Sequence, residues 1–123
     1  MIEQECKELN ERLAKAVGIK KIYYEEWDTE HSCPMFIPSG KPWRTHQIDA
    51  MPVPKFYLSV DTCIKLIYPI LHKPVEIGNI KLKDGAKGWC CRIGNSGWQQ
   101  AASFPLAFCM AADKSFEEVS NAH

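Results

Sequence analysis

Apolar residues near the N-terminus recur at three- and four-residue spacing, which predicts an amphipathic helix over residues 3–17. The apolar stripe of this helix consists of Cys6, Leu9, Leu13 and Val17. Gly18 follows as a natural C-terminal stop, because glycine adopts the left-handed conformation that ends many helices.

A second helix is predicted to begin after Ser59, a favourable N-cap residue, with Asp61 in its first turn, where the helix dipole favours a carboxylate. Its expected apolar face consists of Val60, Ile64, Ile67 and Leu71, with Cys63 and Ile70 beside it. Pro69 lacks a backbone N–H and clashes with the preceding turn, so the helix is expected to end or kink there.

Strands are predicted where residues favour extended structure or alternate between apolar and polar types. A short strand is expected within residues 20–27, and longer ones over 75–82 and 87–93. The glycine-rich turn 94–97 then leads into a partner strand at 98–100, so residues 89–100 form a β-hairpin.

The last predicted helix opens near Ser103 and is apolar on nearly every side, so it should be buried. Residues 114–123 are polar and are expected to form a frayed tail. Five prolines interrupt residues 28–54, which predicts a long irregular loop. The chain is therefore expected to be a single α+β domain over residues 1–123, with a small antiparallel sheet of three or four strands sandwiched by helices.

The net charge of the chain and the sequence of its N-terminus restrict which functions are expected. The chain of 123 residues has fifteen basic and fifteen acidic residues, and this balance argues against binding to duplex nucleic acid. The N-terminus lacks the basic start and apolar run of a signal peptide, and no apolar stretch is long enough to span a bilayer. We therefore expect a protein of the host-cell cytosol.

The six cysteines are expected to be reduced, because cytosolic thiols rarely form disulfides. Cys6, Cys63 and Cys109 lie on apolar helix faces, where a thiol packs as a small hydrophobic group. The adjacent residues Cys90 and Cys91 should point to opposite faces of a sheet.

Three stretches together are similar to a known family. They are residues 9–18 (LNERLAKAVG), residues 54–66 (PKFYLSVDTCIKL), and the segment from the Trp89–Ile93 strand through Trp98 to the alanine-rich residues 101–112. In this order they resemble the small bacteriophage and prophage proteins of the phage ABA-sandwich domain. The sequence departs from that pattern at Ile19, where the family has tryptophan, and in the 28–54 loop. The resemblance implies a fold and a viral origin, and it brings no catalytic motif.

Catalytic and metal-binding motifs are weak in this sequence. His31, Cys33 and His46 are residue types that bind zinc, but they lack the closely spaced ligand pairs of a structural zinc site. No signature of a cysteine nucleophile and no phosphate-binding glycine loop occurs. We therefore expect no metal, no cofactor and no enzymatic activity, with a small Cys/His metal- or thiol-dependent enzyme as an alternative.

Aromatic and cationic residues instead indicate a binding protein. A nucleotide-like ligand needs flat rings for stacking and cations for its phosphates. The candidate ligand-binding residues are Trp27, Lys41, Trp43, Arg44, His46, Arg92, Asn95 and Trp98. Against this hypothesis, Trp89 and Trp98 also fit the core of the hairpin.

The functional hypothesis is a viral counter-defence accessory protein that sequesters a nucleotide-derived host immune signal. The alternative within the same class is an inhibitor that binds a host protein directly. We also expect a homo-oligomer, because aromatic and arginine residues are favoured at interfaces and self-association through a sheet edge or the first helix is plausible.

Overall fold

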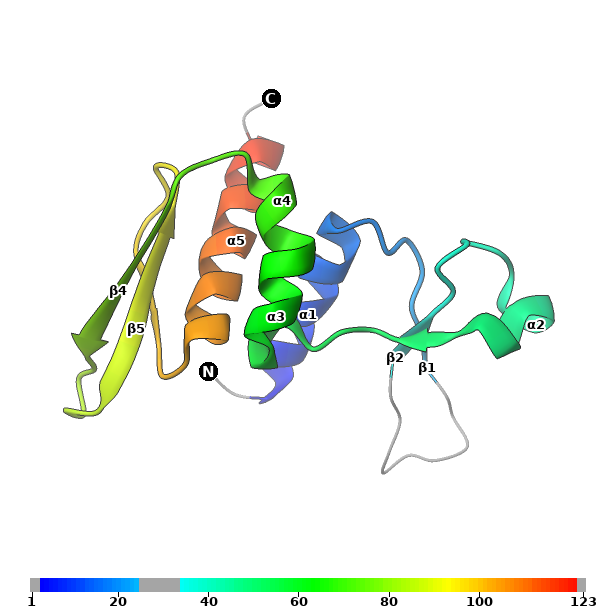
Figure 1. Ribbon diagram of the computed structural model, residues 1–123, viewed down its shortest axis with the longest axis horizontal. Helices are drawn as coiled ribbons and strands as arrows, with labels where there is room; N and C mark the ends of the chain where they lie inside the picture. Colours follow the sequence, from blue (N-terminus) through cyan, green and yellow to red (C-terminus); the bar gives the residue numbers. More distant parts are fainter. Residues whose placement is uncertain (1–2, 25–33, 122–123) are drawn as a thin grey trace. The chain divides into compact units, whose positions relative to one another are not determined.

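The computed structural model describes residues 3–24 and 34–121 (Figure 1). The chain divides into two compact units. The main unit consists of the N-terminal segment as far as Leu13 together with the chain from Lys55 onward, and the small unit consists of residues 14–54. The expectation of a single domain stays a prediction.

The sheet of the main unit is antiparallel and has three strands in the order β4 (Val75–Lys81), β5 (Lys87–Ile93) and β6 (Gln99–Ala101). Strand β5 pairs with β6 in a register that sets Cys91 opposite Gln99. Gly94 begins the hairpin turn with a φ of 62°, a left-handed conformation that favours glycine. The predicted α+β class, the three-stranded antiparallel sheet and the C-terminal hairpin are confirmed.

Helix α5 (Phe104–Asn121) packs on strands β5 and β6. Cys91 and Ile93 are fully buried, and the edge of the Phe104 ring meets Trp89 with ring centroids 5.5 Å apart. The apolar residues predicted for this helix are indeed largely buried: Ala107, Phe108, Cys109, Ala111 and Ala112. The helix continues past Asp113 through polar residues as far as Asn121, and the frayed tail expected over residues 114–123 stays a prediction.

Helix α1 (Glu3–Ala16) buries its predicted stripe at Cys6, Leu9 and Leu13. The neighbouring Asn10 is also buried, and its side-chain oxygen accepts a hydrogen bond of 2.8 Å from the backbone N–H of Phe56 in the short helix η2 (Phe56–Leu58). This bond satisfies a buried donor that has no partner in regular secondary structure.

The second predicted helix forms as three consecutive segments, α3 (Val60–Thr62), the π-helical η3 (Cys63–Ile67) and α4 (Tyr68–Leu71). Ser59 caps it as expected, because its hydroxyl accepts a hydrogen bond of 3.2 Å from the N–H of Thr62. Pro69 does not end the helix. The wider π-helical turn precedes the proline, and the helix continues to Leu71, where His72 ends it with a φ of 52°.

The apolar face of this second helix differs from the prediction. Cys63, Ile67 and Leu71 are buried, whereas Val60 and Ile64 are about half exposed. The π-helical turn explains part of the difference, because its extra residue shifts the face on which later side chains lie. Helix α5 lies between the sheet and these helices, so the main unit has the sheet on one side and α1 with α3–α4 on the other (Figure 1).

The small unit has its own antiparallel sheet of three short strands, β1 (Tyr23–Tyr24), β2 (Pro34–Phe36) and β3 (Met51–Pro52). Helix α2 (Trp43–His46) and the 3-10 turn η1 (Gln47–Asp49) lie between the last two strands. The predicted strand within residues 20–27 thus appears as β1, and residues 25–27 lie outside the described part. We expected a long irregular loop over residues 28–54, whereas residues 34–54 include short strands and helical turns. Pro34 is the first residue of the central strand β2 and Pro52 lies on the edge strand β3, and both are positions that tolerate proline.

Candidate functional site

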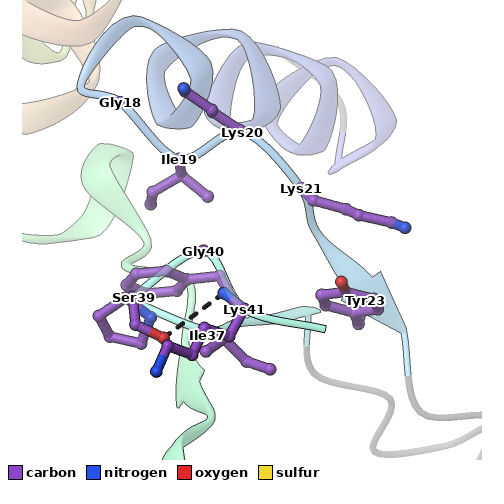
Figure 2. A pocket seen from close by; sticks show the side chains of 11 residues that line it. Gly18, Ile19, Lys20, Lys21, Tyr23, Ile37, Ser39, Gly40 and Lys41 are labelled. Carbon is purple, nitrogen blue, oxygen red and sulfur yellow. Dashed lines mark hydrogen bonds between the residues drawn. The ribbon is translucent and has the colours of Figure 1, made fainter. Parts of the chain in front are cut away.

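A hollow of about 330 Å³ lies within the small unit, between the segment that leaves α1 and the turn that follows β2 (Figure 2). Its lining residues are Gly18, Ile19, Lys20, Lys21, Tyr23, Phe36, Ile37, Pro38, Ser39, Gly40 and Lys41. Its volume is at the lower end of the roughly 300–1,000 Å³ typical of small-ligand pockets.

Two glycines in left-handed conformations shape this hollow. Gly18 has a φ of 105° and donates its N–H to the carbonyl of Lys15, which ends α1 and turns the chain toward β1. Gly40 has a φ of 75° and donates to the carbonyl of Ile37 at 2.9 Å, which closes the opposite turn. A side chain at either position would be strained, so the glycines fix the two walls.

Three lysines line the hollow and give it a positive charge, and none of the described residues in its lining is acidic. Lys21 lies alongside Tyr23, with its ammonium nitrogen 5.3 Å from the ring centroid (Figure 2). Lys20 and Lys41 are exposed, and neither has a carboxylate partner within the described ranges. These two ammonium groups are therefore available to an anion.

The turn at Ser39 adds polar groups to the charge. The hydroxyl oxygen of Ser39 accepts a hydrogen bond of 3.4 Å from the backbone N–H of Lys41 (Figure 2). Ile19 points toward this turn and supplies an apolar wall (Figure 2). An apolar wall, an aromatic ring and several cations suit a small ligand that carries a phosphate or a comparable anionic group.

Of the seven predicted ligand-binding residues that the structure describes, only Lys41 lines this hollow. Trp43, Arg44 and His46 lie together on helix α2 of the same unit. Arg44 is exposed, and the His46 Nδ1 atom is 2.7 Å from the hydroxyl oxygen of Thr45. Trp27 lies outside the described residues.

The remaining three predicted residues lie in the main unit. The Arg92 guanidinium lies 4.9 Å from the centroid of the Trp98 ring and forms an ion pair with Glu76 across the strands. Trp98 is 46% exposed, so it belongs to the outer surface of the hairpin and not to its core. Asn95 is exposed in the hairpin turn. The proposal that all eight residues bind a ligand stays a prediction.

Metal and thiol chemistry find little support among the described side chains. In residues 3–24 and 34–121 no group of three His, Cys, Asp or Glu side chains lies together in a way that could hold a metal ion. His31 and Cys33 lie outside those ranges. The five described cysteines are free thiols, and Cys6, Cys63, Cys91 and Cys109 are buried as small apolar groups.

Sequence reasoning missed Lys20, Lys21 and Tyr23. A signal was present, because two adjacent lysines stand between the helix stop at Gly18 and an aromatic strand. That these residues line one hollow with Lys41 depends on the turns at Gly18 and Gly40, which belong to the tertiary fold.

Comparisons with known proteins support a phage-like fold. A crystal structure of a phage protein from Bacillus cereus ATCC 14579 matches with a TM-score of 0.52 and 14% sequence identity, over 89% of each chain. No protein-family model matches the chain, and no curated protein does. The layer order of the phage ABA sandwich therefore stays a prediction. No helix in the described part of the chain is long and apolar enough to cross a membrane. At the level of the fold, the chain is similar to a phage protein.

Proposed function

We propose that this protein is a non-enzymatic, phage-derived binding protein that takes up a small phosphate-bearing ligand of the nucleotide type. The observation that carries the proposal is the hollow of the small unit, whose lining includes three lysines and Tyr23 and, among the described residues, no acidic side chain. In a host cell, capture of such a ligand would withdraw a nucleotide-derived immune signal, which is a counter-defence function.

Charge and ring placement support a nucleotide over a simple anion. Lys20 and Lys41 are free of carboxylate partners in the described chain, so each can form a charge-assisted hydrogen bond to a phosphate oxygen. The Tyr23 side chain and the apolar wall at Ile19 and Ile37 offer a surface for a base or sugar. A bare phosphate would use the lysines and leave this surface empty.

Isothermal titration calorimetry with a panel of cyclic and ADP-ribose-type nucleotides tests this proposal. We expect one member to bind, and we expect a Lys20→Gln/Lys41→Gln double variant to bind it about a hundredfold more weakly, at roughly tenfold for each lost charged contact. The matched control is Lys83→Gln, which removes an exposed lysine of the main unit. Absence of heat with every nucleotide at millimolar concentration, or equal binding by the double variant, would refute the proposal.

Direct inhibition of a host protein is a second candidate, and an exposed apolar surface in the main unit favours it. Leu58, Val60, Ile64 and Tyr68 follow one another within eleven residues and are between 45% and 65% exposed, and exposed apolar groups of this kind favour a protein interface. A folded Ile64→Asp variant that retains every effect of the wild-type protein on host-cell growth would argue against this candidate.

A further inference from the structure

Two lysines of the main-unit sheet face each other in an unfavourable register. Lys81 at the end of β4 lies directly opposite Lys87 at the start of β5. Side chains of directly opposed residues lie on the same face of an antiparallel pair, and like charges in that position destabilise the sheet. Neither ammonium group has a carboxylate partner in residues 3–24 and 34–121. An anion between them would remove the repulsion.

The next pair on the same face is Asn79 opposite Trp89, since residues two apart on a strand share a face. Trp89 is partly exposed, and its ring packs in a T-shaped arrangement with the Phe104 ring of α5. An amide and an aromatic ring thus lie next to the lysine pair. The amide can donate and accept hydrogen bonds, and the ring offers a stacking surface.

These four side chains line an open surface hollow of about 660 Å³, which is large enough for a small organic ligand. Ile80, Gly88 and Ala102 complete its lining. Ala102 lies two residues before α5, whose first turn has no acidic residue and begins at the same end of the sheet as the turn between β4 and β5 (Figure 1). The positive end of the helix dipole adds to the charge of the lysines.

We infer that this hollow binds a flat aromatic ring that carries an anionic group, and that a nucleoside monophosphate is the ligand class that fits. The phosphate lies between Lys81 and Lys87, the base stacks on Trp89, and the amide of Asn79 hydrogen-bonds to the edge of the base. All of these residues belong to the main unit, so the inference does not depend on the function proposed for the small unit.

Nuclear magnetic resonance titration with AMP tests the inference. We expect AMP to shift the indole N–H signal of Trp89 and the backbone signals around Lys81 and Lys87. Adenosine lacks the charge and inorganic phosphate lacks the ring, so each should bind at least about tenfold more weakly than AMP. Absence of any shift at Trp89 with millimolar AMP would overturn the inference.

Single variants assign the binding to this hollow. Lys81→Gln and Lys87→Gln should each weaken AMP binding about tenfold, whereas Lys83→Gln, in the adjacent turn outside the lining, should leave it unchanged. The Lys20→Gln/Lys41→Gln variant of the small unit should retain the Trp89 shift, which separates the two sites. Equal AMP affinity in wild type and in both main-unit variants would contradict the inference.

Charge reversal separates loss of the site from loss of the fold. Lys81→Glu places opposite charges across the two strands, so this variant should unfold at the same or a higher temperature than wild type while losing AMP binding. A Lys81→Glu variant that still binds AMP with wild-type affinity would show that the lysine pair does not hold the phosphate.

Discussion

At the scale of single residues, the thiols show how burial determines chemistry. Cys91 is fully buried under α5, and this burial, with a smaller effect of Cys90, raises its pKa to about 11. The contact of Cys109 with Cys63, at 3.6 Å between the sulfur atoms, and burial likewise raise the pKa of Cys109. Both thiols are therefore protonated at neutral pH and are poor nucleophiles there.

The raised pKa of Cys91 predicts a loss of stability at alkaline pH. An unperturbed thiol ionises near pH 9.0 and the folded-state thiol near pH 11, so the unfolded chain loses its proton first. The stabilisation is complete below pH 9 and decreases as the pH rises to about 11. Urea denaturation across this window should show the decrease, and it should be smaller in a Cys91→Ala variant. The same pH dependence in both proteins would contradict the assignment.

At the scale of the element, close packing restricts the sheet of the main unit at one glycine. A Cβ atom added to Gly88 would lie 2.7 Å from the Leu82 side chain and 2.9 Å from the backbone oxygen of Ala101. The backbone atom belongs to the paired strand β6, so it cannot move without disturbing the sheet. Gly97 differs, because nothing lies within 4 Å of its added Cβ atom.

We therefore expect Gly88→Ala to destabilise the protein by about 1–3 kcal/mol through overpacking. The matched control Gly97→Ala should change the free energy of unfolding by less than about 0.5 kcal/mol. Chemical denaturation of the two variants beside wild type measures both values. Equal stability of all three proteins would show that the sheet adapts to a methyl group at Gly88.

At the scale of the whole chain, an ion pair connects the first and last helices of the main unit. The Arg12 guanidinium of α1 binds the Asp113 carboxylate of α5 through contacts of 3.0–3.2 Å, and this pairing raises the pKa of Arg12. The two residues are 101 positions apart in the sequence. Arg12 is 55% exposed, so solvent weakens the attraction.

A double-mutant cycle with Arg12→Met and Asp113→Asn should give a coupling of about 0.5–1 kcal/mol, because the pair is bidentate but partly exposed. The coupling should decrease as salt is added. The pair Asp61 and Lys65 is a suitable control, because both side chains are more than 70% exposed and should couple less. A coupling energy that stays the same as salt is added would contradict an electrostatic interaction between Arg12 and Asp113.

Much of the main unit follows from local sequence. The stripe at Cys6, Leu9 and Leu13, the cap at Ser59 and the β5–β6 hairpin depend on short-range spacing and turn chemistry. The periodicity of an apolar pattern determines which face is buried, whatever the partner is. These predictions are confirmed because each depends on residues that are close in the sequence.

Helix α3–α4 shows where local rules are insufficient. Pro69 predicts an end or a kink, yet a π-helical turn precedes the proline and the helix continues to Leu71. Val60 and Ile64 fit an apolar face but remain half exposed, since the elements that pack on the helix cover the side of Cys63 and Ile67. Whether a segment forms a helix depends largely on its own residues, whereas the side of the helix that is buried depends on the elements that pack against it.

The sequence by itself determined the α+β class, the terminal hairpin and the buried final helix, and it predicted the residue types from which an anion site is proposed. Only the tertiary structure decided which of these residues meet. Lys20 reaches the same hollow as Lys41 because Gly18 and Gly40 turn the chain, and Lys81 faces Lys87 because of the register between β4 and β5. Spacing and composition identify the residue types that are suited to binding a ligand. Strand register and turn geometry decide which of these residues come together, because they connect positions that are far apart in the sequence.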